Sequence, residues 1–282
     1  QIYVDAGAGW ADLKLNSDAT NGGSIYFNDG ADAGQIWYYH PDNTMRFHTD
    51  GTERMRISGG NVGVNTSAVR STVHIKAANN NWESGLLIEN NSGNKGWNFH
   101  PETNGELLIG YNTATNASLT DQTASLVMKL DTSGAVTKTN QPAFLVTKNA
   151  NQNNIAANTD VVVTWTTEVF DVGSNFNTST NVFDAPVSGK YQLSSNIRID
   201  NIDSSANYYI VSIFTSNRLF RAVYSLNTLS ADPVYWAFTL SITADMDAGD
   251  HAWVTVNQGG GSVQADIAGD VSYTQFSGYL LG

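Results

Sequence analysis

The sequence has no cysteine, and two further scarcities narrow the class of protein. Without cysteine, neither disulfide bonds nor thiolate metal ligands hold the chain together. Five prolines beside 25 glycines exclude a collagen-like repeat. No apolar stretch approaches the roughly 18 residues of a membrane span, so we expect no membrane insertion.

Charged residues are also scarce, and most of them are acidic. Charged residues make up 14% of the chain, against about 25% in typical soluble proteins. Lys and Arg number 14 and Asp and Glu 26, a net charge of −12. Binding to phosphate groups requires clustered cations, so the sequence predicts neither nucleic acid nor an anionic membrane as a partner. The acidity itself is explained by solubility and names no partner.

Alternation of period two is the dominant pattern, and it predicts β-strands. Its clearest example is 190–199, where every second side chain shares one face: Tyr191, Leu193, Ser195, Ile197 and Ile199. Turn signals such as Asn28-Asp29-Gly30 recur every ten or so residues. Many short strands at this spacing predict an all-β sandwich, barrel or fibre.

The N-terminal half contains an internal repeat with an offset of sixty residues. The segment 37–42 (WYYHPD) is echoed by 97–102 (WNFHPE), and the close 55–64 (MRISGGNVGV) by 128–137 (MKLDTSGAVT). The second copy carries an Asn- and Thr-rich insertion near residues 111–123. Repeated units that cannot bury their own apolar face are expected to stack, along the chain or between chains. We expect the two tryptophans to occupy equivalent positions.

The pattern changes at 139–142 (TNQP), where glycine-centred turns give way to longer apolar strands. We therefore predict three parts: a first fibre repeat at 1–72, a second at 73–140, and a head domain at 141–282.

Residues 24–64 resemble the repeat of many phage tail fibres. The resemblance rests on 40–47 (HPDNTMRF), 50–57 (DGTERMRI) and 61–64 (NVGV). It implies an elongated trimer built from short strands.

Residues 141–282 resemble the complement-1q-like and tumour-necrosis-factor-like jelly roll. The resemblance rests on Phe170-Asp171 followed by 183–191 (FDAPVSGKY), on 248–254 (AGDHAWV), and on the closing 276–281 (FSGYLL). It implies a β-sandwich that forms homotrimers, with its inner sheet and last strand near the three-fold axis. The apolar close is therefore expected to form the trimer interface, through Phe276, Tyr279, Leu280 and Leu281.

The middle of the head follows no family pattern and is rich in aromatic and arginine side chains. Sugar faces stack on aromatic rings, and guanidinium groups suit carboxylates or phosphates of surface glycans. We therefore expect ligand contacts from Tyr208, Arg218, Arg221, Tyr224, Tyr235 and Trp236. Neighbours on a strand point to opposite faces, so only one of Tyr208 and Tyr209 can enter the core, and likewise for Tyr235 and Trp236.

The sequence predicts no catalytic residues, no metal site and no cofactor. His40 and His100 recur without an H-x-H spacing, which favours a structural role over a metal site. Calcium remains an alternative for the acidic loop residues, although no EF-hand-type loop is present; these residues are Asp200, Asp203, Asp245, Asp247 and Asp250.

Taken together, these features predict a homotrimeric phage tail fibre that attaches a virion to a glycan or protein on a bacterial surface. The chain begins at Gln1 without an initiator Met. We therefore expect it to be a fragment or a processed product, whose missing N-terminal part would contact other tail or baseplate proteins. The alternative is an extracellular bacterial surface or exosporium adhesin with the same head.

Overall fold

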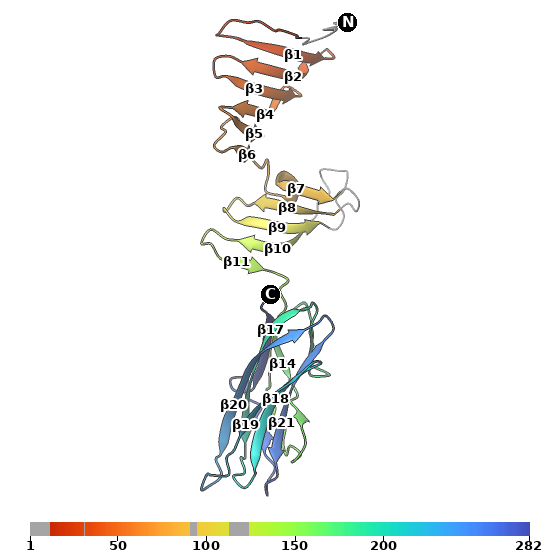
Figure 1. The fold of residues 1–282 in the computed structure, drawn as a ribbon, viewed down its shortest axis with the longest axis vertical. Helices are drawn as coiled ribbons and strands as arrows, with labels where there is room; N and C mark the ends of the chain where they lie inside the picture. The colour runs from red at the N-terminus through yellow and green to blue at the C-terminus, as the bar shows by residue number, and fades with distance from the viewer. Residues whose placement is uncertain (1–11, 31, 91–94, 113–123) are drawn as a thin grey trace. The chain divides into compact units, whose positions relative to one another are not determined.

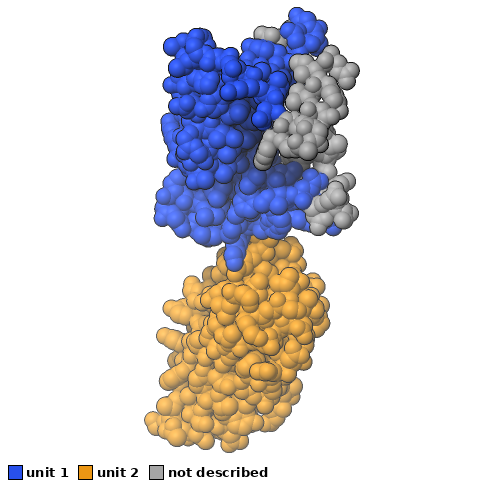
Figure 2. Space-filling model, turned by 45° about the horizontal axis from the view of Figure 1, so that its top comes forward, with its two compact units in different colours: residues 1–138 blue, residues 139–282 orange. Residues whose placement is uncertain are grey.

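The structure, a computed structural model, describes residues 12–30, 32–90, 95–112 and 124–282. The chain divides into two compact units, unit 1 (Gln1–Lys138) and unit 2 (Thr139–Gly282), which Figure 2 colours separately. In the described ranges, strands form all of the regular structure except the short 3-10 helix η1 (Trp82–Ser84). The predicted all-β fold is confirmed. The expected insertion near 111–123 lies almost entirely outside the described residues.

Unit 1 contains two separate sheets, each a single layer of strands in chain order (Figure 1). The first consists of β1 (Gly22–Asn28), β2 (Asp32–Tyr39), β3 (Thr44–Thr49), β4 (Thr52–Ser58), β5 (Asn61–Val64) and β6 (Val73–Ile75). Its strands are antiparallel except for β5 and β6, which are parallel. The predicted boundary after residue 72 falls within this sheet, because β6 completes it.

The first sheet has one apolar and one polar face. A continuous apolar row crosses all six strands, through Ile25, Ile36, Phe47, Met55, Val64 and Ile75. The end members Ile25 and Ile75 are 41% and 43% exposed. On the other face, the Arg46 guanidinium lies 5.0 Å from the centre of the Trp37 ring. The apolar face is therefore left largely open to solvent by its own chain.

The second sheet repeats the antiparallel meander with five strands. These are β7 (Leu86–Asn90), β8 (Lys95–Pro101), β9 (Leu107–Asn112), β10 (Ser125–Leu130) and β11 (Val136–Lys138). An apolar row crosses four of its five strands, through Leu86, Phe99, Ile109 and Met128, and meets Lys138 on β11. Leu86 on this row, and Ile88 and Trp97 on the row beside it, are 44%, 58% and 43% exposed.

The sixty-residue echo is a repeat of strand order, not of side-chain surroundings. Trp37 and Trp97 both lie on the second strand of their sheets. Trp37, however, lies beside Arg46 on the polar face, whereas Trp97 pairs with Ile88 and Tyr111 on the apolar face. A shift of one residue along a strand exchanges its two faces. The two tryptophans therefore lie on corresponding strands with different side-chain neighbours, and the superposition of the backbone around them stays a prediction.

Unit 2 is a sandwich of two sheets that cover each other. One sheet has the order β14-β12-β23-β17-β20, with β22 beside β17, and the other has β15-β16-β21-β18-β19, with β13 beside β21. The strands of the first are β12 (Ala143–Thr147), β14 (Thr167–Val172), β17 (Gly189–Asp200), β20 (Tyr235–Met246), β22 (Asp266–Ile267) and β23 (Gln275–Leu280). Those of the second are β13 (Val161–Val162), β15 (Phe176–Asn177), β16 (Val182–Asp184), β18 (Tyr208–Thr215), β19 (Leu219–Tyr224) and β21 (His251–Gly259).

The core of unit 2 lies between these sheets and follows the predicted alternation. All five residues expected to share a face of β17 are fully buried: Tyr191, Leu193, Ser195, Ile197 and Ile199. Tyr209 is also fully buried while Tyr208 is only partly so, as strand geometry requires. Of Tyr235 and Trp236, by contrast, neither is buried, because both lie at the start of the edge strand β20.

Asp203 ties together two loops at one end of the sandwich. Its carboxylate is 2% exposed and accepts hydrogen bonds from the Ser205 hydroxyl at 2.6 Å and the Val263 amide at 2.7 Å, with a further contact from the Ser262 amide. Burial alone would raise the pKa of Asp203, but these hydrogen bonds outweigh it and hold the pKa well below its ordinary value.

We expect the charge of Asp203 to contribute to the acid stability of unit 2. Because its pKa is lower in the folded than in the unfolded state, the contribution is complete above about pH 4 and is lost as the pH falls further. The Asp203→Asn substitution keeps the shape but removes the charge, and should lower the free energy of unfolding by roughly 2 kcal/mol at pH 7. Urea unfolding followed by near-UV circular dichroism at pH 7 and near pH 3 measures this. An equal loss at both pH values would contradict the role of the charge.

Candidate functional site

A hollow of about 390 Å³ opens on the sheet that contains β17 and β20. Its lining combines one cation with three aromatic rings, from Arg198, Tyr235, Trp236, Ala237 and Tyr273. Arg198 comes from the end of β17, Tyr235 to Ala237 from the start of β20, and Tyr273 from the loop before β23. The hollow therefore lies at the end of the sandwich opposite Ala143, where the chain enters unit 2.

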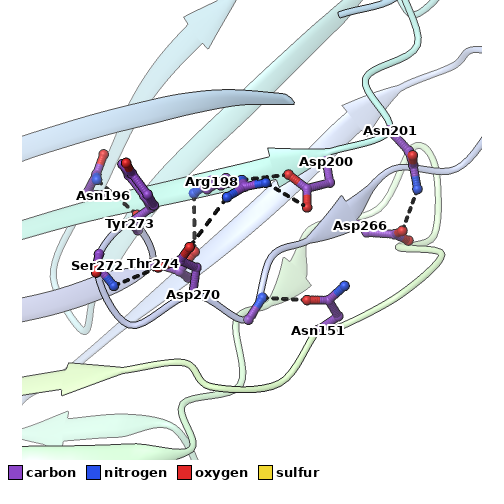
Figure 3. A network of polar contacts seen from close by, with 11 residues as sticks. Asn151, Asn196, Arg198, Asp200, Asn201, Asp266, Asp270, Ser272, Tyr273 and Thr274 are labelled. Atoms are coloured by element: carbon purple, nitrogen blue, oxygen red, sulfur yellow. Dashed lines mark hydrogen bonds and ion pairs between the residues drawn. The ribbon is translucent and has the colours of Figure 1, made fainter. Parts of the chain in front are cut away.

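Arg198 is held in place by two carboxylates (Figure 3). Its Nε donates to Asp200 at 2.8 Å, and its Nη1 lies 3.4 Å from Asp270. The hydrogen bond to Asp200 raises the pKa of Arg198, so the guanidinium is permanently charged. Both acids are partly exposed, and the pairs therefore fix the geometry of the guanidinium more than they stabilise the fold.

Two tyrosine rings lie against this fixed guanidinium. The centre of the Tyr235 ring is 4.6 Å from its central carbon, and that of Tyr273 is 5.8 Å away. Tyr235 and Tyr273 are nevertheless 59% and 51% exposed, and Trp236 is 43% exposed. The cation–π contacts with Arg198 thus hold the exposed rings of Tyr235 and Tyr273 in position, where a ligand can stack on them.

The loop that carries Tyr273 is fixed by its own hydrogen bonds (Figure 3). Asp270 accepts hydrogen bonds from the Ser272 amide at 2.9 Å and, through its carbonyl, from the Thr274 amide at 2.8 Å. The Asn196 side chain donates to the Tyr273 carbonyl at 2.9 Å. The site is therefore largely preorganised, which reduces the entropy lost on binding.

Four of the six expected ligand residues lie outside this hollow. Tyr224 donates its hydroxyl to the Thr239 carbonyl at 2.8 Å and packs on Phe238 at the edge of the core. Arg221 pairs with Asp160 at 3.1 Å on the other sheet. Tyr208 pairs with Gly259 on β21 of that same sheet.

Arg218 lies at the opposite end of the sandwich. It belongs to the turn that begins at Thr215. In this turn the Ser216 amide donates to the His251 carbonyl at 3.0 Å. Asp245 lies at this same end of the sandwich. With the usual rise per residue of a strand, Asp245 is about 30 Å along β20 from Tyr235, so this end is far from the hollow. Of the six expected ligand residues, only Tyr235 and Trp236 therefore lie together in the hollow. The sequence analysis missed two other side chains that line it, Arg198 and Tyr273. The one signal for Arg198 was its place on the outward face of the alternating strand.

The expected interface residues separate into two groups. Phe276 is fully buried in its own sandwich, where its ring lies 5.0 Å from Phe144 and 6.0 Å from Trp165. It is therefore a core residue, which corrects the expectation that another chain buries it. Tyr279 and Leu281 are 49% and 50% exposed, and Leu280 is partly buried. Their place in an interface stays a prediction.

The carboxylates of Asp200, Asp203, Asp245 and Asp250 are engaged with other protein groups. Asp200 pairs with Arg198, Asp245 with Lys190 at 2.5 Å, and Asp250 accepts from the Asp247 amide at 2.8 Å. Among the described residues, no group of three or more His, Cys, Asp or Glu could hold a metal ion.

The two histidines of the repeat differ in their surroundings. The His100 ring is 2% exposed and its Nε2 lies 3.2 Å from the Asn80 side chain, whereas His40 lies against the Tyr38 ring. Across the part of the chain that the structure describes, no helix has the length and apolarity needed to cross a membrane.

Comparison with known proteins bears on unit 2 alone. The C1q domain family model matches residues 143–281. Among solved structures, the globular domain of zebrafish complement 1qA is similar, with 17% identity and a TM-score of 0.37 over 50% of this chain and 98% of that one. Murine APRIL at pH 8.0 is similar as well, with 14% identity and a TM-score of 0.37 over 50% of this chain and 99% of that one. No curated protein matches the chain. Residues 143–281 form a C1q/TNF-like jelly-roll domain.

Proposed function

We propose that the chain is the distal part of a phage tail fibre, a receptor-binding protein that attaches the virion to its bacterial host. The observation that carries the proposal is the combination of two single-layer repeat sheets with a jelly-roll domain that has a preorganised aromatic hollow. The tail-fibre resemblance of residues 24–64 supports it. C1q/TNF-like domains are typically binding modules without enzymatic activity, which agrees with an attachment role.

The open faces of unit 1 support assembly with further copies of the chain. Each repeat sheet has an apolar row across its strands, and several large side chains on these faces are about half exposed. A soluble monomer rarely leaves contiguous apolar surface of this kind in water. Equivalent faces of identical chains are self-complementary in chemistry, and packing them together covers all copies at once.

The head supports a trimer as the form of this assembly. C1q/TNF family domains typically form homotrimers. In this head the closing strand β23 leaves Tyr279 half exposed on the outward face of its sheet, with Leu281 following it. A second chain that covers these two side chains would stabilise the complex by the hydrophobic effect, at roughly 25 cal/mol per Å² of apolar surface.

The hollow beside Arg198 is the proposed receptor contact. It shares the outward face of its sheet with Tyr279 but lies at the other end of that sheet, so the proposal confines the trimer contact to the Tyr279 end. It presents exposed rings for the apolar face of a sugar and a fixed cation for hydrogen bonding to hydroxyl or carboxylate groups. Three such hollows in one trimer, and several fibres on one virion, would combine weak single contacts into firm attachment. The receptor is accordingly a glycan or a glycosylated surface protein.

A bacterial surface or exosporium adhesin with the same head is the alternative, located outside the cell. The jelly-roll domain is compatible with both, whereas the repeat sheets favour the fibre. Binding of the labelled protein to a panel of bacterial strains tests the proposal, because a phage receptor-binding protein should discriminate sharply between strains. Equal binding to all strains, or to none, would contradict it.

The trimer is tested by mass and by one substitution. Sedimentation equilibrium at micromolar concentration should return three times the 30.4 kDa chain mass. Tyr279→Ala should weaken assembly by about 2 kcal/mol per chain if its ring is an interface anchor. Val223→Ala, at a side chain that is 59% exposed on the other sheet, is the control and should leave the mass unchanged. A monomer in the unmodified protein would refute the trimer.

The receptor contact is tested by Trp236→Ala. Because this ring is 43% exposed and lies at a strand end, its removal should lower the melting temperature by only a few degrees, corresponding to about 1 kcal/mol or less. Attachment to susceptible cells should fall about tenfold or more, since exposed aromatic anchors carry binding energy without supporting the fold. Flow cytometry with the labelled variant measures attachment. If Trp236→Ala unfolds the head instead, the receptor contact lies elsewhere.

A further inference from the structure

A second hollow, of about 440 Å³, opens on the other sheet of the sandwich. It is lined by Asn177, Thr180, Val182, Asp184, His251 and Trp253. None of these residues belongs to the hollow beside Arg198. Its volume lies within the range of about 300–1,000 Å³ that is common for small-ligand sites.

Strand register brings the lining residues together on one rigid surface. Asn177 pairs with Val182 across β15 and β16, and Asp184 pairs with His251 across β16 and β21. These side chains alternate with core residues such as Phe183, which is 1% exposed. Because the same strands form the core, the hollow is fixed by the packing of the sandwich rather than by a mobile loop.

The floor of the hollow is aromatic. Trp253 pairs with Phe214 on β18, and the two rings stack with centres 5.1 Å apart and planes inclined by 10°. Trp253 is only partly buried and lines the hollow, so part of its ring is available to a ligand. A fixed aromatic ring of this kind offers a surface for the C–H face of a sugar ring.

The rim supplies oriented hydrogen-bonding groups. The Asp184 carboxylate holds the His251 ring through one oxygen, with Oδ1 and Nδ1 2.5 Å apart. The side-chain oxygen of Asn177 accepts a hydrogen bond from the Ser179 amide at 2.9 Å. The side-chain nitrogen of Asn177 therefore points away from Ser179. Among the described residues, neither the second Asp184 oxygen nor this amide nitrogen has a hydrogen-bond partner.

We propose that this hollow binds a neutral sugar unit of a glycan. A ring hydroxyl pair can donate to the free Asp184 oxygen and accept from the Asn177 amide while the sugar face lies on Trp253. The lining contains no Lys or Arg, and Asp184 repels anions, so sialic and uronic acids are disfavoured. The inference rests on the proposed function in one respect only: if the Tyr279 end of the sheet with β23 packs at the trimer axis, this opposite sheet faces away from the axis and stays open.

Titration of the full-length protein with single sugars tests the proposal. The probes are the methyl glycosides of glucose, galactose and N-acetylglucosamine, with N-acetylneuraminic acid as the acidic comparison, and ligand-observed NMR is the readout. At least one neutral glycoside should bind in the millimolar range in a way that depends on Trp253, and any Trp253-dependent binding of the acidic sugar should be at least tenfold weaker. No binding of any neutral glycoside, or Trp253-dependent binding of the acidic sugar that is tighter than that of the neutral ones, would overturn the assignment.

Two substitutions connect this binding to the hollow. Trp253→Ala should weaken the binding of the neutral glycoside about tenfold, equivalent to roughly 1.4 kcal/mol. Asp184→Asn should weaken it as well, and because this side chain is 53% exposed the fold should be unaffected. Val223→Ala, at a 59% exposed side chain of the same sheet that lines neither hollow, is the control and should bind the glycoside as the unmodified protein does. Unchanged binding in both Trp253→Ala and Asp184→Asn would refute the site.

Attachment of the same variants to cells separates this inference from the proposed function. Strain-specific attachment without any sugar binding would contradict the Trp253 hollow alone. Sugar binding that depends on Trp253, without attachment to any bacterial strain, would contradict the tail-fibre function and leave the sugar site standing.

Discussion

The apolar face of a β-sheet must be covered, and the two halves of this chain meet that requirement differently. In unit 2 each sheet covers the other, and residues such as Leu193 and Val254 are completely buried within one chain. In unit 1 each sheet is one layer thick, and rows such as Ile25 to Ile75 face outward. The head therefore has a core of its own, whereas the repeats have none, and the proposed assembly would cover their apolar faces with other copies of the chain.

The closed sandwich also explains why the head can present binding groups at fixed positions. Its outward side chains are carried by strands whose inward neighbours are packed in the core, so residues such as Tyr235 and Trp253 are attached to a rigid backbone. In the hollow beside Arg198, the ion pairs to Asp200 and Asp270 also fix the position of the Arg198 guanidinium. Both hollows use the same combination of an aromatic ring and a charged or amide group.

Sequence periodicity predicted the parts of the fold that follow from strand geometry. The alternation along β17 and the burial of only one of Tyr208 and Tyr209 depend only on neighbours in the chain. Contacts between distant segments were not predictable in this way. Arg198 meets Tyr273 because a loop before β23 returns to the end of β17, and Phe276 is buried because β23 lies in the middle of its sheet. Lys148, 2% exposed and bonded to Thr164 at 2.7 Å, shows the same limit, since nothing local marks it as a core residue.

The position of β23 has a consequence for biosynthesis. This strand, Gln275–Leu280, lies between β12 and β17, so the middle strand of the sheet is made some 130 residues after the first one. The head cannot close during translation until Gln275–Leu280 has emerged. A premature stop or frameshift ahead of this strand would therefore leave the sheet without its central strand. No shortened head could form, and the neighbouring strands would keep unpaired edges.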